Sequence, residues 1–339
     1  MTAFIREAVP QHDDIDGVPS PAERERIVGH PAQRAELAAA AQGGRLHHAW
    51  LLQGPRGIGK ASVAYDFARA LLVGNGDPGG IRQIAQGAHP NLLHIARGPA
   101  DRGGFRTQIT VDEVRRLNHF FQTTAGGRWR IAIIDPAEDM NRNAANALLK
   151  ILEEPPARCV FLIVNHLPGR LLPTIRSRCR VLRFEALDET EVADILAADL
   201  PETPADTLSH AARRAEGSAR AGFMMIEGGG LEVGAEVERL YAQRPDWAAL
   251  QKLLDALTVK GREAAYERML TEIFRLLAAE ASERLATGDL RRAAALSDLW
   301  SQEQARWREA AAFNLDRKQV ALTFFRKLEA AREAGGLPA

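Results

Sequence analysis

The sequence predicts an α/β domain built on a parallel sheet with helices on both faces, followed by two smaller helical domains. Between residues 27 and 185, short β-rich runs alternate with helical patterns, which is typical of a covered parallel sheet. The first run leads into a glycine-rich loop at 54–60 and then into a helical pattern. After Leu187 the β-rich runs stop, and apolar residues recur at helical spacing to about residue 334.

The chain length agrees with this division, because 339 residues exceed one ordinary core. We expect a loose acidic tail over 1–20, the sheet domain over 21–186, a small helical domain over 187–235 and a C-terminal helical domain over 236–335. Gly228 to Gly230 form an expected hinge. Each expected strand is short, apolar and bounded by turn residues. These strands are 49–53, 92–96, 129–135, 160–165 and 180–184.

Local signals place individual helices within these domains. Thr110 and Glu113 form a capping box before one helix of the sheet domain. In the C-terminal domain, Trp247, Leu250 and Leu254 recur at helical spacing. Such a pattern is typical of the core of a helical bundle, and a subunit contact is the alternative.

Charge and cysteine content exclude several classes of protein. The 44 basic residues equal the 44 acidic ones, so net charge indicates no nucleic-acid or membrane partner, and any DNA contact needs a local patch. Cys159 and Cys179 are too few for a disulfide framework or a four-cysteine zinc site. The sequence shows neither a membrane-spanning apolar run nor a signal-peptide pattern, so we expect a cytoplasmic protein.

The run GPRGIGK at 54–60 lies between an expected strand and an expected helix, as a phosphate-binding loop requires. Gly54, Gly57 and Gly59 let backbone amides close around phosphate oxygens. The helix that follows adds its N-terminal dipole, and Lys60 places a positive charge near the terminal phosphates. ATP or ADP is therefore the expected ligand.

The residues after this loop argue against strong magnesium binding. P-loop enzymes carry a Ser or Thr that ligates the ion where this chain has Ala61. The hydroxyl of Ser62 faces another side of the helix, because successive residues turn by about 100°. Ala61 and Ser62 thus belong to the nucleotide site without completing its metal ligands.

The end of the expected strand 129–135 argues against hydrolysis. Asp135 is the acidic residue that ends such a strand, but Pro136 follows where an ATPase has the glutamate that acts on water. Glu138 and Asp139 are displaced from that position, and we expect helix-start or solvated charges there. Turnover by this chain is expected to be slow or absent.

Two longer runs carry a resemblance to a known family. NAANALLKILEEPP at 143–156 and LLPTIRSRC at 171–179 resemble the delta-prime clamp-loader subunits of bacterial DNA polymerase III, members of the AAA+ class. The resemblance spans most of the chain and is strongest from 129 to 184. It implies an AAA+ domain followed by a small helical lid and a C-terminal helical collar.

The resemblance implies a hetero-pentamer with gamma or tau motor subunits and a delta subunit, which places a sliding clamp on primed DNA. It further implies that Arg178 is an arginine finger, presented in trans to the nucleotide of a neighbouring motor subunit. Such a residue stabilises charge on the transferring phosphoryl group. A surface arginine is the alternative, and the Ser-Arg-Cys motif favours the finger. The chain would be a subunit of the polymerase holoenzyme without a polymerase site of its own.

Other positions carry weaker implications. By resemblance, Asn165 is the sensor 1 residue and Arg220 the sensor 2 residue, each contacting phosphate. A strand-end turn residue and an exposed helix arginine are the alternatives. Arg128, Arg130 and Arg142 are candidates for DNA phosphate contacts, although scattered arginines are usually solvated.

The sequence departs from the family in two ways. Many relatives carry a cysteine-ligated zinc module after the P-loop helix, whereas 73–87 contains no cysteine, so we expect no zinc. The better-studied delta-prime chains have lost the P-loop, whereas Lys60 persists here, so nucleotide binding stays open.

Two other functions are alternatives to a non-hydrolysing clamp-loader subunit. One is an actively hydrolysing AAA+ ATPase, such as a motor subunit or a branch-migration helicase, and Ala61 and Pro136 argue against it. The other is an ATP-regulated scaffold outside replication. The Ser-Arg-Cys motif argues against a scaffold, which has no need of a trans-acting arginine.

Overall fold

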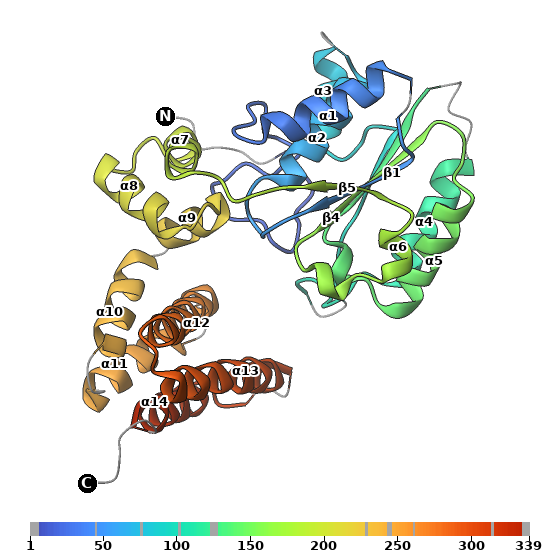
Figure 1. Ribbon diagram of the computed structural model, residues 1–339. Coiled ribbons are helices and arrows are strands. Elements are labelled where there is room, and N and C mark those ends of the chain that lie inside the picture. Colours follow the sequence, from blue (N-terminus) through green and yellow to red (C-terminus); the bar gives the residue numbers. More distant parts are fainter. Residues whose placement is uncertain are drawn as a thin grey trace. The chain divides into compact units, whose positions relative to one another are not determined.

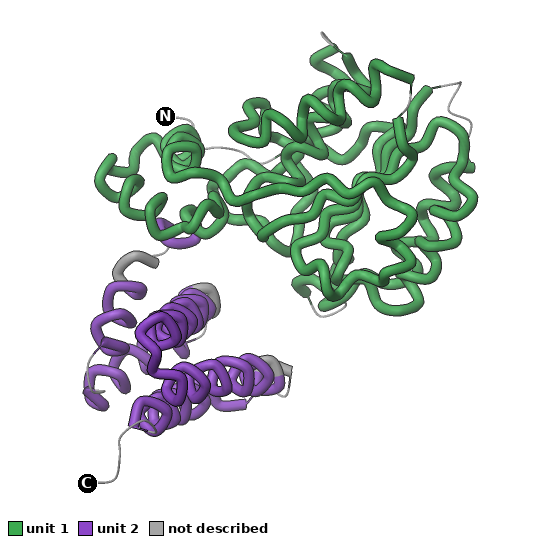
Figure 2. The backbone as a smooth tube through the Cα atoms, in the orientation of Figure 1, with its two compact units in different colours: residues 1–223 green, residues 224–339 purple. Residues whose placement is uncertain are grey.

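The computed structural model of the chain divides into two compact units, residues 1–223 and residues 224–339 (Figure 2). Gly228 and Gly229 of the expected hinge lie outside the described residues. The structure describes residues 7–44, 46–74, 77–100, 103–122, 128–227, 230–242, 246–259, 262–312 and 315–333.

A parallel five-stranded sheet forms the centre of the first unit (Figure 1). Its order is β2-β3-β4-β1-β5, and each neighbouring pair is parallel. All five strands expected from the sequence are present, with bounds within about one residue of the prediction. They are β1 (Ala49–Gln53), β2 (Leu92–Ile95), β3 (Arg130–Ile134), β4 (Cys159–Asn165) and β5 (Arg180–Arg183).

Helices cover both faces of this sheet, because side chains of each strand point alternately to the two sides. In β1, Trp50 and Leu52 join the apolar cluster under α1, α2 and α3, whereas Ala49 and Leu51 join the cluster under α4, α5 and α6. Figure 1 shows these two layers. The helices are α1 (Pro31–Gln42), α2 (Lys60–Leu72), α3 (Pro78–Ala85), α4 (Val111–Gln122), α5 (Arg142–Glu153) and α6 (Pro173–Arg176), with short 3-10 turns η1 (Ala137–Asp139) and η2 (Pro168–Arg170).

The strand order brings three loops to one edge of the sheet. β1 lies between β4 and β5, and Gln53 at its end pairs with Asn165 of β4 and Arg183 of β5. The loops that follow β1, β3 and β4 therefore begin close to one another. In an open parallel sheet, ligands bind at the carboxyl ends of strands where the strand order reverses.

Three short helices complete the first unit and continue to residue 226: α7 (Glu189–Asp199), α8 (Ala205–Arg214) and α9 (Ala219–Ile226). The amide of Leu187 donates to the carbonyl oxygen of Gly217 at 3.1 Å. Gly217 has a φ of 79°, and a Cβ there would lie 2.4 Å from the carbonyl oxygen of Leu187. Glycine therefore allows the turn before α9 to pack against the end of the sheet domain.

The second unit consists of helices packed around one apolar cluster. Leu250 and Leu254, predicted as part of a bundle core, are buried there together with Ile273 and Phe324. Helical amphipathicity explains this burial. The helices are α10 (Gly230–Ala242), α11 (Trp247–Leu257), α12 (Glu263–Ala286), α13 (Leu290–Ala312) and α14 (Arg317–Glu333).

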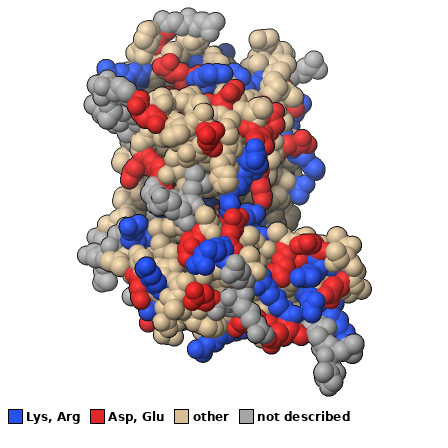
Figure 3. All heavy atoms as spheres, turned by 90° about the vertical axis from the view of Figure 1, so that its left-hand side faces the viewer, with Lys and Arg blue, Asp and Glu red and all other residues tan. Residues whose placement is uncertain are grey.

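The surface agrees with the balanced composition of the sequence. On the face in Figure 3, acidic and basic side chains of the described residues are intermixed over both units. Arg130, a candidate for DNA contact, is only 6% exposed, and its guanidinium lies 5.4 Å from the centre of the Phe120 ring. Its side chain is therefore part of the interior. Among the described helices, none combines the length and apolar character that a membrane crossing needs.

Candidate functional site

The loop from Gly54 to Gly59 joins β1 to α2 at the carboxyl edge of the sheet. Gly57 and Gly59 have φ values of 81° and 100°, which glycine adopts without strain. A Cβ on Gly54 would lie 2.3 Å from the carbonyl oxygen of Phe184. All three predicted glycines are thus required by the local backbone. The first N–H groups of α2 lack intrahelical acceptors, and this arrangement favours an anion.

Lys60, the first residue of α2, is held beneath this loop and is 2% exposed. Its ammonium donates to the carbonyl oxygen of Gly54 at 2.8 Å and to that of Pro55. Burial lowers the pKa of Lys60 to about 8, and the carboxylates of Asp135 and Glu138 partly oppose this shift. The carbonyl oxygens of Gly54 and Pro55 therefore accept from the Lys60 ammonium, which could donate to the phosphate oxygens of a nucleotide instead.

Asp135 follows β3 and lines the same cavity as Lys60. Burial of the carboxyl raises the pKa of Asp135 to about 7, and the negative charge of Asp13 adds to the shift. Its side chain nevertheless keeps 21% of its surface accessible, and His166 Nε2 lies 3.8 Å from its Oδ1. Burial and the nearby Lys60 lower the pKa of His166 to about 3, so this imidazole is neutral at pH 7. Asp135 is thus partly protonated at neutral pH.

Asn165 ends β4 and is fully buried. Its Nδ2 donates to Glu138 Oε2 at 2.9 Å, and Glu138 also accepts from the amide of His166 at 3.0 Å. Among described atoms, Asn165 Oδ1 has no hydrogen-bond partner. A carboxylate can only accept hydrogen bonds, so the contact with Glu138 fixes the orientation of the Asn165 side-chain amide. Its nitrogen faces Glu138, and its oxygen remains available as an acceptor.

The prediction that Glu138 and Asp139 are helix-start or solvated charges is therefore incomplete. Both lie in η1, but the Glu138 carboxylate binds the end of β4. Asp139 accepts from Arg97 Nε at 2.6 Å, and its side chain is 16% exposed. Each carboxylate is held inside the fold by a donor distant in sequence.

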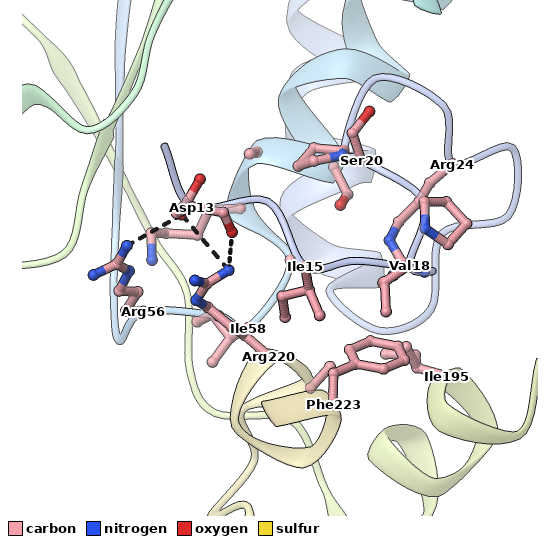
Figure 4. Close-up of a pocket in the computed structure, with 18 of the residues that line it drawn as sticks. Asp13, Ile15, Val18, Ser20, Arg24, Arg56, Ile58, Ile195, Arg220 and Phe223 are labelled. Atoms are coloured by element: carbon pink, nitrogen blue, oxygen red, sulfur yellow. Dashed lines mark hydrogen bonds and ion pairs between the residues drawn. The ribbon is translucent and has the colours of Figure 1, made fainter. Parts of the chain in front are cut away.

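Arg220, near the start of α9, reaches the same cavity. Its amide donates to the carbonyl oxygen of Gly57 at 3.2 Å, and Ser218 Oγ donates to the carbonyl oxygen of Arg56 at 3.0 Å. These bonds dock the start of α9 on the P-loop. The side chain of Arg220 donates to the backbone oxygen of Asp13, and its Nη1 lies 3.9 Å from Asp13 Oδ2 (Figure 4).

Residues 7–20, the N-terminal segment, lie against the P-loop, although the sequence predicts a loose tail over 1–20. Glu23 holds this segment, because its carboxylate accepts from the amide of Glu7 at 2.7 Å and from that of Ser20 at 2.9 Å. Val18 is buried. Residues 1–6 of the predicted tail lie outside the described residues.

One cavity of about 150 Å³ collects most predicted cofactor residues. Its polar side is formed by the P-loop and its apolar side includes Ile15, Val18 and Phe223 (Figure 4). Gly54 and Asn165 adjoin this cavity without lining it. The predicted residues that line it are Gly57, Gly59, Lys60, Ala61, Ser62, Asp135 and Arg220.

The sequence did not single out three residues that line this cavity, namely Asp13, Arg56 and His166. Arg56 lies inside the P-loop run, where its position carries no fixed side chain. Asp13 is remote in sequence, so no local spacing could place it against Arg56. Only the folding of the N-terminal segment brings them together.

Arg178 lies apart from the residues that line this cavity. It stands between α6 and β5, and its side chain is 36% exposed. Its Nη2 donates to Glu153 Oε1 at 2.6 Å and its Nη1 to the carbonyl oxygen of Thr174 at 3.1 Å. The arginine is therefore accessible and held in one orientation.

The residues present fit phosphate better than metal. Positive-φ glycines, a buried ammonium and Arg220 converge on one cavity, as a nucleotide needs. Ala61 offers no ligand for magnesium, and the raised pKa of Asp135 weakens that carboxyl as a ligand. Among the described residues, no cluster of three His, Cys, Asp or Glu side chains could hold an ion. The expected absence of zinc stays a prediction.

Comparison with known proteins agrees with the resemblance found in the sequence. A family model described as "DNA polymerase III, delta subunit" matches residues 29–188. The DNA polymerase III subunit delta' of Pseudomonas aeruginosa is 41% identical over 177 residues, which is 49% of this chain and 52% of that protein. The chain resembles a delta-prime subunit of DNA polymerase III. The expected α/β architecture is also confirmed, with a parallel sheet covered by helices and followed by helical parts.

Gamma/tau subunits of DNA polymerase III also match this chain. The gamma/tau subunit of Mycobacterium tuberculosis is 35% identical over 185 residues, which is 52% of this chain and 31% of that protein. The matches thus span about half or less of these relatives' lengths. A solved structure of a gamma subunit-related protein from Thermotoga maritima covers 88% of this chain and 99% of its own, at 17% identity and a TM-score of 0.49.

Proposed function

We propose that this chain is the delta-prime subunit of a bacterial clamp loader. In this role it joins gamma or tau and delta subunits in a hetero-pentamer, which loads a sliding clamp onto primed DNA during replication in the cytoplasm. The observation that carries the proposal is Arg178, exposed before β5 and outside the cavity of its own chain. The resemblance to delta-prime and gamma/tau subunits supports the choice of partners.

Arg178 acts on a neighbouring subunit. Its guanidinium is already desolvated on one side by Glu153 and Thr174, so little ordering is needed when it approaches a phosphate. Guanidinium is planar and always charged, which suits bidentate contact with a transferring phosphoryl group. Charge that develops on that group in the transition state is stabilised by the arginine, whereas the ground state gains less.

The chain's own cavity binds ATP or ADP and turns it over slowly or not at all. Lys60 and the P-loop amides hold the phosphates, and Arg220 supplies a second positive charge. Magnesium lacks a ligand at Ala61, and Asp135 is partly protonated at neutral pH. The side-chain amide of Asn165 donates to Glu138 Oε2 and to the carbonyl oxygen of Leu167, so both of its N–H groups are engaged and none is left for a terminal phosphate.

A working ATPase is the second candidate, and Glu138 is the observation that favours it. Its carboxylate lies close enough to affect Lys60 and binds the backbone and side chain at the end of β4. A carboxylate there could orient water. Two donors already occupy it, however, and Ala61 leaves the metal poorly held, so the non-hydrolysing role remains our proposal.

The domain boundaries belong to this proposal. The AAA+ domain covers 21–186, the lid 187–235 and the collar 236–335. The lid then takes in α7, α8 and α9 and the start of α10. The collar is the oligomerisation domain, and its interior is the apolar cluster of the second unit.

Reconstitution tests the trans role directly. A loader is assembled from this chain, motor and delta subunits, clamp and primed DNA, and its ATP turnover is measured with Arg178→Ala. Arginine fingers contribute roughly 10³ to 10⁵ in rate in well-studied GTPases, so we expect a loss of about tenfold or more for the whole assembly. Arg176→Ala, an exposed arginine on α6, is the matched control. Unchanged turnover in an intact Arg178→Ala assembly would refute the trans role.

A further inference from the structure

The N-terminal segment (7–20) is a closed loop rather than an open arm. Glu23 binds amides at both of its ends, as described above. Arg82 Nη2 adds an ion pair to Glu7 Oε1 at 3.0 Å, and the side chain of Val18 is buried. These contacts lie on both sides of the acidic part of the segment. They fix where that acidic part falls on the P-loop.

Asp13 is the residue that this loop delivers to the cavity. Its Oδ2 accepts from Arg56 Nη2 at 3.2 Å and lies 3.9 Å from Arg220 Nη1. The backbone oxygen of Asp13 also accepts from Arg220. Figure 4 shows Asp13 between the two arginines. All three residues line the cavity that also contains Lys60 and Asp135.

We propose that Asp13 is an intramolecular occupant of the phosphate end of this cavity, and that a nucleoside di- or triphosphate binds by displacing it. The proposal rests on the proposed nucleotide binding by this chain. A carboxylate held by two guanidinium groups has the charge and bond pattern with which arginines hold a phosphate. Asp13 therefore blocks the empty site and competes with its ligand.

Electrostatics supports exchange over joint occupancy. Asp13 already disfavours ionisation of Asp135, since it is the second-largest cause of that residue's raised pKa. A diphosphate would bring at least two further negative charges to the same arginines, and like charges a few ångströms apart repel strongly in a partly buried site. The repulsion between the two anions therefore favours exchange of one for the other. Because the Asp13 and Arg56 side chains are 36% and 49% exposed, their pairing is weak enough to open.

Binding of ADP by Asp13→Asn tests the proposal on the full chain, without magnesium, using a fluorescent ADP analogue. If the open state makes up on the order of 1–10% of molecules, removing the competing charge tightens ADP binding by about 10- to 100-fold. Asp16→Asn, an exposed acid of the same segment, is the matched control and should bind as the wild type does. Unchanged or weaker binding by Asp13→Asn would overturn the proposal, because Asp13 would then be neutral or a wall of the ligand site.

Hydrogen exchange of the wild-type chain gives a second, independent readout. Addition of ADP should speed amide exchange in residues 7–20, because displacement of Asp13 frees the segment. Slower or unchanged exchange there would contradict displacement. Absence of ADP binding by both wild type and Asp13→Asn would overturn this proposal and the nucleotide role of the cavity. The Arg178→Ala assay does not require that cavity, so the trans role is judged separately.

Discussion

Arg178 Nη2 lies 2.6 Å from Glu153 Oε1, which joins the loop before β5 to the last residue of α5. Both side chains are substantially exposed, at 36% and 43%. Exposed ion pairs contribute about 0–1 kcal/mol to stability, so this pair does little to hold the fold together. Its structural effect is to orient the arginine. Glu153 is thus a positioning residue for the proposed finger.

Glu153→Gln should therefore lower ATP turnover of the assembled loader by about two- to tenfold, less than Arg178→Ala. The amide keeps one acceptor but loses the charge that holds the guanidinium. Glu154→Gln, the adjacent exposed glutamate, should have no effect. Glu153→Gln and Glu154→Gln should melt at the same temperature as the wild type. Full turnover in Glu153→Gln would mean that Arg178 needs no orientation by its own chain.

Ala61→Thr should make nucleotide binding depend on magnesium. The hydroxyl restores a metal ligand at the start of α2, so magnesium should tighten ATP binding by about five- to tenfold, as measured by titration calorimetry. Ala61→Val has a similar shape without the oxygen and should show no such gain. Hydrolysis should remain slow because Pro136 is unchanged. Rapid hydrolysis in Ala61→Thr would revive the working ATPase.

The sequence predicts the sheet and P-loop well because their signals are local. Each strand is a short apolar run, and Gly54, Gly57 and Gly59 mark a backbone that tolerates little else. Arg178 lies in a recognisable motif, and the structure adds its pairing with Glu153. That pair links the end of α5 to the loop before β5, 25 residues along the chain, and no periodicity encodes it.

The N-terminal segment shows where sequence reasoning ends. Residues 1–20 are polar and acidic, a composition typical of a solvated tail. Residues 7–20 are held by Glu23 and by arginines at 56, 82 and 220, whose partners are set by the tertiary fold. Asp139 likewise meets Arg97 only after β2 and β3 pair. The composition of a segment therefore does not reveal the residues elsewhere in the chain that will bind it.

The raised pKa of Asp135 predicts a pH-dependent cost to stability. Its folded pKa of about 7 exceeds the ordinary 3.8, so the folded state holds more protons between these values. The stabilisation that Asp135 gives the folded state is therefore fully present below about pH 4, and it is lost as the pH rises through about 7. His166, whose pKa is lowered to about 3, acts in the opposite sense, so raw stability curves would mix the two.

Asp135→Asn isolates the effect when its free energy of unfolding is compared with the wild type at pH 5 and pH 8. Because the amide does not titrate, the free energy of unfolding of the variant relative to the wild type should be higher at pH 8 than at pH 5, by on the order of 1–3 kcal/mol. Denaturant unfolding gives both numbers. Asp16→Asn, which replaces an exposed acid of the same unit, is the matched control. A constant difference for Asp135→Asn would contradict the raised pKa.

Glu303 of α13 is a buried charge, and its removal should destabilise the second unit. It is fully buried and accepts from Trp307 Nε1 at 3.0 Å, Lys327 Nζ at 2.7 Å and Arg306 Nη1 at 3.0 Å. Glu303→Ala leaves the indole N–H without its acceptor and opens a cavity, while the two cations can still reach water. We expect a loss of about 2–4 kcal/mol in denaturant unfolding. Glu309→Ala, exposed on the same helix, should change stability by about 0.5 kcal/mol or less. Equal stability of the two variants would show that the cations, once released into solvent, offset the lost contacts.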